Sequence, residues 1–203
     1  MAQVINTNVA ALFAGAALNK SAIALQTAQQ RLSSGVRINS AKDDATGLVN
    51  ATNTDALIRA ANVSIRTEND TISDLQTQDG YLAIVTDNLL RIAEVGASST
   101  EGTALTTENT NILKLVTAAP AQNLSAVGAA RATLGGGMAV AASKVATQQV
   151  LSVNLSAKYS RIMDTDYAVE STNMARANIL QQAGTAALAQ ANQTPNTVLT
   201  LLR

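Results

Sequence analysis

Apolar residues recur along this chain at intervals of three, four and seven, the spacing of helices that bury one stripe of side chains. In the first segment, five apolar residues lie at multiples of seven, as in the seam of a coiled coil: Val4, Ala11, Leu18, Leu25 and Leu32. Other apolar side chains of the segment lie off that seam: Val9, Leu12, Phe13 and Ile23. A helix that is apolar on several sides needs several neighbours. A single partly buried helix in a bundle is the alternative interpretation.

Two further apolar patterns predict a long helix and a return helix. The first indicates one helix over residues 44–95, roughly 75 Å long at about 1.5 Å per residue. Its continuation over residues 96–110 has the glycines, serines and threonines of a loop, and a short helix is expected before Pro120. The second pattern predicts a return helix over residues 121–162, interrupted by the glycine run at 134–138. Asp164 or Asp166 is expected to cap a last helix.

Charge is segregated between these segments. Residues 1–42 carry a net charge of +4, residues 43–108 carry −8, residues 109–163 carry +5 and residues 164–203 carry −1. The acidic long helix and the basic return helix are therefore expected to be the arms of an antiparallel hairpin. Exposed ion pairs contribute only tenths of a kcal/mol each, so the apolar seam must supply most of the stability.

Composition excludes several function classes. The chain has no cysteine or histidine, so it lacks thiolate nucleophiles and the usual general base and metal ligand. Basic residues are spaced singly and aromatic residues are 2% of the chain, which is not the pattern of a nucleic-acid-binding protein. The N-terminus has no secretory signal pattern, and the uncharged residues 177–202 are too rich in amides to span a membrane. We expect no enzyme, no cofactor, no nucleic-acid partner and no membrane partner.

Local motifs favour structural roles over chemistry. Lys42, Asp43 and Asp44 lack the spacing of a calcium loop and are typical of a charged turn or helix start. The glycine run at 134–138 follows no strand and lacks the lysine of a phosphate loop. The termini are the unusual feature, because residues 1–30 carry one charge, Lys20, and residues 177–202 carry none. Such apolar and amide-rich helices indicate a surface that other copies of the chain cover.

Terminal motifs of the chain closely resemble those of bacterial flagellin. They are "INTNVAAL", "LNKS", "QRLSSGVRINSAKDDATGL" and, at the far end, "SRIMDTDYAVESTNMARANILQQAGTAALAQANQTPNTVLTLLR". The resemblance covers residues 1–95 and 121–203. It implies an all-α, elongated antiparallel hairpin or coiled-coil rod with paired terminal helices. The implied domains are an inner-tube domain (residues 1–43 with 163–203) and a helical rod (residues 44–162) whose tip loop lies near 96–120.

The resemblance also implies a function and partners. The chain is expected to be a structural subunit of the flagellar filament, extracellular and exported without a cleavable signal peptide. Expected partners are other copies, an export chaperone, and cap and hook-junction proteins. The assembly interface is expected to include Val4, Leu18, Leu25, Leu32, Ile179, Leu180, Leu188 and Leu199. An inter-domain joint is expected at Arg31, Gly35, Arg37, Asn39, Lys42, Asp43 and Asp44.

The chain departs from the usual flagellin pattern between its arms. Only residues 96–120 separate them, so the chain resembles a minimal flagellin without outer domains. In the segment "NLLRIAE" Leu90 and Ala93 replace a glutamine and an arginine of the usual pattern. That segment, with Leu89, Arg91 and Glu94, belongs to the surface that the vertebrate innate flagellin receptor recognises in the family. Alternative interpretations are a hook–filament junction protein and a chemoreceptor-like signalling hairpin.

Overall fold

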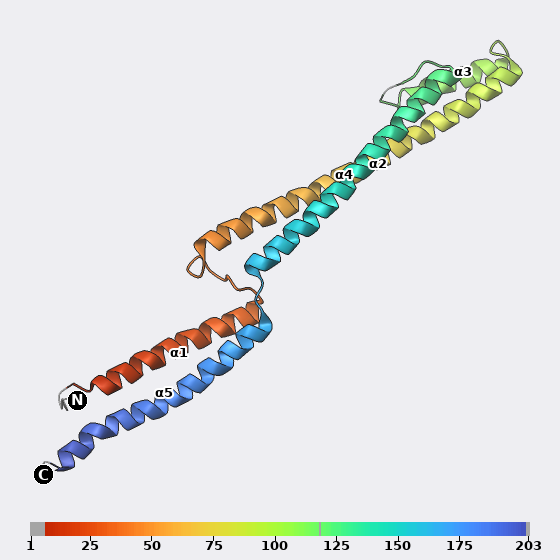
Figure 1. The fold of residues 1–203 in the computed structure, drawn as a ribbon. Helices are drawn as coiled ribbons and strands as arrows, with labels where there is room; N and C mark the ends of the chain where they lie inside the picture. Colours follow the sequence, from red (N-terminus) through yellow and green to blue (C-terminus); the bar gives the residue numbers. More distant parts are fainter. Residues whose placement is uncertain (1–6, 118, 202–203) are drawn as a thin grey trace. The chain divides into compact units, whose positions relative to one another are not determined.

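The computed structural model of the chain describes residues 7–117 and 119–201. These residues form five helices and, as far as they are described, no strand (Figure 1). The helices are α1 (Val9–Ser34), α2 (Ala45–Val95), α3 (Thr100–Leu113), α4 (Leu124–Met163) and α5 (Tyr167–Leu201). The all-α fold class is confirmed, and so is the single helix that the sequence predicts over most of residues 44–95.

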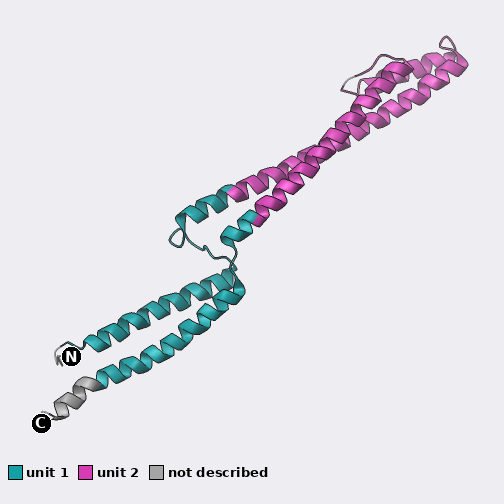
Figure 2. Ribbon diagram, in the orientation of Figure 1, with its two compact units in different colours: residues 1–53, 158–203 teal, residues 54–157 magenta. Residues whose placement is uncertain are grey.

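The chain folds as two compact units (Figure 2). The first unit combines residues 1–53 with residues 158–203, and the second consists of residues 54–157. Helices α1 and α5 belong to the first unit and α3 belongs to the second. Helices α2 and α4 each contribute residues to both units.

Each of the five helices begins directly after a polar side chain that accepts a hydrogen bond from a backbone N–H of the first turn. These N-cap residues are Asn8, Asp44, Ser99, Asn123 and Asp166, with donor–acceptor distances from 2.7 to 3.1 Å. The first backbone N–H groups of a helix have no partner within the helix, and a cap of this kind typically contributes about 1 kcal/mol. Of the two aspartates considered for the last helix, Asp166 is therefore the cap.

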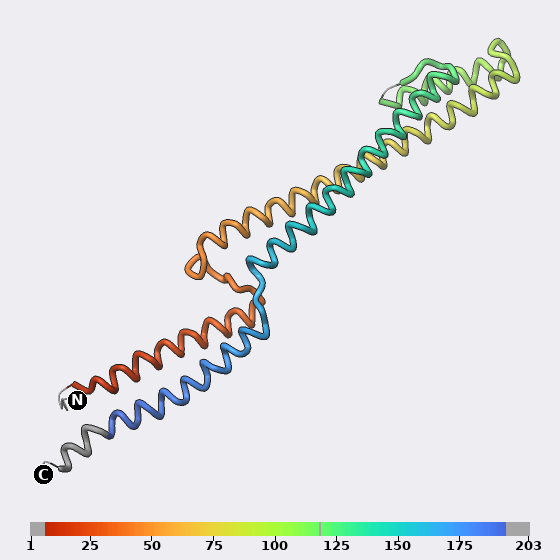
Figure 3. Tube along the Cα trace, in the orientation of Figure 1, coloured from red at the N-terminus to blue at the C-terminus, as the bar shows by residue number. Residues whose placement is uncertain are grey.

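In the second unit, α2 and α4 pack antiparallel, as the charge segregation predicts (Figure 3). Three polar pairs between the two helices follow one another in opposite order along each: Asp79 with Arg131 at 2.8 Å, Glu68 with Lys144 at 3.1 Å, and Asn62 with Ser152 at 3.3 Å. The two ion pairs join the acidic α2 to the basic α4. The glycine run does not interrupt α4. An added Cβ at Gly137 would lie 3.2 Å from Cδ1 of Leu75, so this glycine lets α2 approach closely.

Helix α3 corrects the prediction of a loop over residues 96–110. The segment turns at Gly96, whose φ is +86°, and becomes helical from Thr100. Its threonine hydroxyls donate to the backbone carbonyl four residues earlier, so Thr106 bonds Gly102 and Thr110 bonds Thr106. Hydroxyl-rich composition suggested a loop because such residues weaken isolated helices, but here their hydrogen bonds follow the helix.

Tertiary packing explains why α3 is stable. Leu113 of α3 and Val116, which follows it, lie in a buried cluster with Leu82 and Val85 of α2 and Val127 of α4. The fully buried Asn109 accepts a 2.8 Å hydrogen bond from Nδ2 of Asn88 on α2. A helix of this length is marginal alone, so the cluster supplies the burial that its sequence lacks.

The ion pair between Asp79 and Arg131 predicts a pH-dependent contribution to stability. The hydrogen bond from Arg131 lowers the pKa of Asp79 below its usual value of about 3.9. A carboxylate with a lowered folded-state pKa stabilises above its unfolded-state pKa, and this contribution is lost as the pH falls through the folded-state pKa. Because the pair is half-exposed, we expect Arg131→Gln to lower the free energy of unfolding by about 0.5–1 kcal/mol at pH 7.

Urea unfolding followed by circular dichroism at pH 7 and near pH 2.5 measures this difference. The two chains should become equal in stability at the lower pH. Arg66→Gln is the control, since Arg66 forms no ion pair among the described residues, and it should have little effect at either pH. A stability difference for Arg131→Gln that is as large at low pH as at pH 7 would contradict the assignment.

Candidate assembly surface and joint

Helices α1 and α5 pack against each other in antiparallel orientation. Near one end, Nδ2 of Asn8 donates a 2.8 Å hydrogen bond to the carbonyl of Ala191. Near the other end, Nη1 of Arg31 lies 3.6 Å from Oε2 of Glu170, a carboxylate that is largely buried. The first and last described turns of the chain therefore lie at the same end of this hairpin (Figure 1).

The seam between α1 and α5 is thin because small residues form much of it. The buried side chains are Ser21 and Ala28 on α1 and Ala177 on α5, besides Glu170. Where a larger residue occurs, the opposite position is small: an added Cβ at Gly184 would lie 3.3 Å from Cδ1 of Leu18. Small residues allow close approach of the two backbones, but they remove little apolar area from water.

The outer surface of α1 is apolar as well. The four side chains that the sequence places off the seam are exposed, by 63% to 79%: Val9, Leu12, Phe13 and Ile23. Helix α1 is also long and apolar enough to cross a bilayer by length and composition, with a mean hydropathy of 1.3 over its most apolar window. Only 6% of that window is fully buried in the chain itself.

The predicted assembly residues are divided between the seam and the outer surface. Leu18, Leu25, Leu32 and Leu188 are half-buried. Ile179 and Leu180 are exposed by 66% and 53%. Val4 lies outside the described residues, and Leu199 lies in α5 with its side chain outside them.

The predicted joint residues form a hydrogen-bonded crossing of two chain segments in the first unit. Gly35 ends α1 with a φ of +72°, and its carbonyl accepts a 3.0 Å hydrogen bond from the backbone N–H of Thr165. Nη2 of Arg37 donates to the carbonyl of Ile162 at 2.8 Å. Nε of Arg31 donates to the carbonyl of Arg37 at 3.0 Å, and the same guanidinium pairs with Glu170. Two arginines therefore fasten the segment after α1 to the segment before α5.

The second part of the joint is a turn that leads into α2. The Asp43 carboxylate accepts hydrogen bonds from the backbone N–H groups of Asn39 and Ser40 and from the Ser40 hydroxyl. The bond from the Ser40 backbone is the main reason that the pKa of Asp43 is lowered. Asp44 caps α2, while Lys42 is exposed. The charged residues of this turn thus stabilise backbone geometry, as the sequence interpretation favoured over a metal site.

Sequence reasoning missed the apolar centre of the joint. Ile38 is 2% exposed and forms a buried cluster with Ala51 and Met163. Gly47 is required beside it, because an added Cβ would lie 2.7 Å from Cδ1 of Ile38. The available signal was an aliphatic residue between Arg37 and Asn39, in a stretch that is mostly polar. Glu170 was missed as the partner of Arg31, although it is the one acid in α5.

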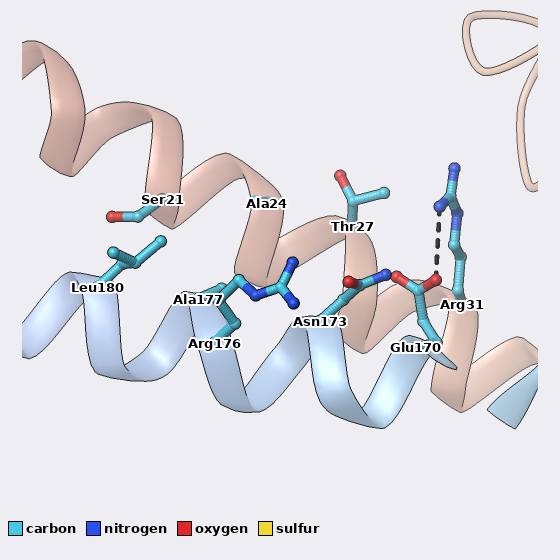
Figure 4. Close-up of a pocket in the computed structure, with 9 residues that line it drawn as sticks. All are labelled: Ser21, Ala24, Thr27, Arg31, Glu170, Asn173, Arg176, Ala177 and Leu180. Carbon is cyan, nitrogen blue, oxygen red and sulfur yellow. Dashed lines mark ion pairs between the residues drawn. The ribbon is translucent and has the colours of Figure 1, made fainter. Parts of the chain in front are cut away.

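A groove runs along one flank of the α1–α5 hairpin. Its more apolar half has a volume of about 510 Å³. Besides Lys20 and Leu180, small residues line it: Ala17, Ser21, Ala24, Ala183, Gly184 and Ala187. The adjoining half is polar, and Figure 4 shows Thr27, Arg31, Asn173 and Arg176 around it. Ser21, Ala24 and Leu180 line both halves, so the groove is continuous. Arg176 has no ion pair among the described residues, unlike Arg31.

The predicted receptor segment lies on α2 beside α3. Leu89 is half-buried against the core of the second unit. Arg91 donates to Glu101 of α3 at 2.8 Å and to Glu94 at 3.1 Å, and these carboxylates raise its pKa. Leu90 is 49% exposed. The guanidinium of Arg91 is therefore already held by two carboxylates of its own chain.

The residues described here offer packing faces. No three acidic side chains among them come together as metal ligands do. The two helical units, the apolar outer surface of α1 and the hydrogen-bonded joint define an all-helical structural and interaction protein.

Comparison with known families identifies the family to which this all-helical protein belongs. The model of the bacterial flagellin N-terminal helical region matches residues 5–119, and that of the C-terminal helical region matches residues 113–202. The chain belongs to the flagellin family, whose members are structural proteins. The two matched regions overlap over residues 113–119, so the chain lacks a variable domain between them.

Curated relatives share about half of this chain. Flagellin of Salmonella muenchen is 50% identical over 103 residues, which are 51% of this chain and 20% of that protein. Flagellins of Salmonella rubislaw and Salmonella typhimurium are each 48% identical over 103 residues, covering 51% of this chain and 21% of their own length. The chain therefore matches about a fifth of the length of these relatives.

The positive φ of Gly35 predicts that the joint does not tolerate a side chain there. We expect Gly35→Ala to lower the free energy of unfolding by about 1–2 kcal/mol, because L residues are strained in the left-handed region. Gly15→Ala is the matched control in the interior of α1, where an added Cβ meets nothing within 4 Å. That control should stabilise by about 0.5–1 kcal/mol. Urea unfolding of unassembled chains measures both, and equal effects of the two substitutions would argue against the role of Gly35.

Proposed function

We propose that this chain is a structural subunit of the bacterial flagellar filament, and that it polymerises through its terminal helices. One observation carries the proposal. Helix α1 pairs with α5 on one face and leaves Leu12, Phe13 and Ile23 exposed on others. Apolar side chains exposed in this number along one helix typically mark an interaction surface. Family membership makes other copies of the chain the natural partner.

In this proposal the chain divides into an inner-tube domain and a rod. The inner-tube domain consists of residues 1–43 with 163–203, and the rod consists of residues 44–162. Assembly contacts are made by the residues named from the sequence, which include Leu18, Leu180 and Leu188. The joint from Arg31 to Asp44 connects the domains, and its hydrogen bonds to Ile162 and Thr165 support that role.

Family membership also supports a proposal for the location of the subunit, its export and its further partners. The filament is extracellular, and the subunit reaches it by flagellar export. An export chaperone, a cap protein and hook-junction proteins are the further partners proposed. The terminal helices suit contacts of this kind, because over residues 1–30 and 177–202 they carry a single charge and offer mostly apolar and amide surface.

Deleting residues 177–203 tests whether the terminal helices are needed for assembly while the rod keeps its helicity without them. We expect the truncated chain to lose polymerisation, because α1 then has neither its seam partner nor the groove. The helicity of α2 and α4 should persist, because the buried cluster around Leu82 and Val127 does not include α5. Sedimentation and electron microscopy measure assembly, and circular dichroism measures helicity. Filaments from the truncated chain, or a collapse of rod helicity, would refute the proposed division.

We further propose that the innate flagellin receptor of vertebrates recognises this chain weakly. Leu90 and Ala93 lack polar groups of the usual family segment, and Arg91 is bound to Glu94 and Glu101. A receptor group left without its hydrogen-bonding partner costs about 1–3 kcal/mol. Activation should therefore be weaker than for a receptor-competent flagellin.

A reporter-cell assay tests this prediction with two variants. Leu90→Gln combined with Ala93→Arg should increase activation, and Glu101→Gln should add to it by releasing Arg91. Glu108→Gln, also on α3, is the matched control because Glu108 forms no ion pair with Arg91. Full activation by the unmodified chain, or no response to the restored residues, would contradict the proposal.

A further inference from the structure

Two backbone hydrogen bonds close the joint. The N–H of Arg37 donates to the carbonyl of Met163, and the N–H of Thr165 donates to the carbonyl of Gly35. Together these bonds enclose a single antiparallel β-bridge. Even a two-stranded hairpin with more such bonds is only marginally stable in water, so side chains must hold this crossing closed.

An apolar contact holds one side of the crossing. Ile38, which follows Arg37, is buried with Ala51 of α2 and Met163 of α4. The partly buried residues that pack against this cluster follow α1 and precede α5 in the chain: Val36, Leu48, Tyr159 and Ile162. The apolar side of the joint is therefore built without side chains of the α1–α5 hairpin, as far as the described residues show.

A single guanidinium connects the crossing to the α1–α5 hairpin. Arg31 lies in the last turn of α1, and its Nη1 is 3.6 Å from Oε2 of Glu170 in the first turn of α5 (Figure 4). Its Nε donates to the carbonyl of Arg37 at 3.0 Å. The side chains of Arg31 and Glu170 are only 29% and 10% exposed, so their attraction is screened less than that of a surface pair.

The two contacts of Arg31 stabilise each other. An arginine side chain is long and loses much rotamer freedom when it is held in one place. Once Glu170 has fixed the guanidinium, its hydrogen bond to the carbonyl of Arg37 forms at a lower entropic cost. The converse is equally true, because the hydrogen bond to Arg37 holds the guanidinium beside Glu170.

We propose that Arg31 couples the pairing of α1 with α5 to the closure of the joint. The joint stays closed while Glu170 lies against Arg31, and it opens more often when the start of α5 is displaced. Such coupling is reciprocal, so opening of the joint also loosens the first turn of α5. All of these residues lie in the first unit of one chain, so the inference goes beyond the proposed function and can fail independently of it.

Amide hydrogen exchange, resolved by nuclear magnetic resonance on the full-length unassembled chain, measures the coupling at the Arg37 amide. Glu170→Gln removes the charge that faces Arg31 and leaves the residues of the crossing unchanged. We expect the protection of the Arg37 amide to fall about fivefold or more, the lower end of the usual range for two coupled sites. Arg176→Gln is the matched control, because Arg176 lines the same groove on α5 without an ion pair among the described residues. It should leave the protection nearly unchanged.

A second background tests whether Arg31 carries the effect. In an Arg31→Gln chain, Glu170→Gln should cause no further loss of protection at the Arg37 amide, because the connecting guanidinium is already gone. The same loss in both backgrounds would overturn the inference. So would an Arg37 amide that is unprotected in the unmodified chain, or a loss confined to amides of α5.

The reverse direction is tested by Arg37→Gln, which removes the 2.8 Å hydrogen bond to the carbonyl of Ile162. This variant should lower the protection of the Glu170 amide, which donates to the carbonyl of Asp166 at 3.0 Å. Arg37 has no printed contact with that amide, so a loss there reports transmission through the joint. Unchanged protection of the Glu170 amide would overturn the coupling.

Discussion

The contact between α1 and α5 is the constraint on which the rest of the first unit depends. Its seam buries small side chains such as Ala28 and Ala177, so each helix turn contributes little apolar burial. Close approach is possible because residues such as Gly184 leave space for Leu18. Because small residues fill the seam, larger apolar residues lie on the outside, Phe13 and Ile23 among them. A hairpin built this way holds its two helices in register while leaving large apolar side chains exposed.

The second unit is stabilised differently from the first. Its core contains fully buried aliphatic side chains, Leu82, Val85 and Val127, contributed by two helices and reinforced by α3. Ion pairs such as Asp79 with Arg131 join α2 to α4 and support their antiparallel orientation. Charges on this unit keep its surface hydrated, whereas residues 177–201 of α5 carry none. The second unit thus has a core of larger side chains, whereas the first leaves many of its larger apolar side chains exposed.

Sequence reasoning succeeded where a pattern repeats and failed where tertiary contacts decide. The heptad row through Leu18 and Leu25 and the long apolar pattern of α2 are repeated signals, and the structure places them in helices. The stretch over 96–110 was interpreted from local composition, which omits the N-cap at Ser99 and the burial of Leu113. Ile38 and Gly47 were missed in the joint for the same reason. A single buried residue in a polar loop leaves no periodic signal, and its importance follows from Met163 more than a hundred residues away.

The amides of the terminal helices follow from the two environments that such a surface must meet. Before assembly it faces water, so an entirely apolar surface would promote aggregation. In the proposed assembly it is buried, and each buried charge would need a partner and would still cost several kcal/mol to desolvate. Glutamine and asparagine lie between these limits, because an amide is well hydrated, costs less to bury than a charge and can both donate and accept. The near absence of charge from α1, with Gln26 and Gln30 in place of lysine or glutamate, is therefore the expected composition of a helix that is exposed first and buried later.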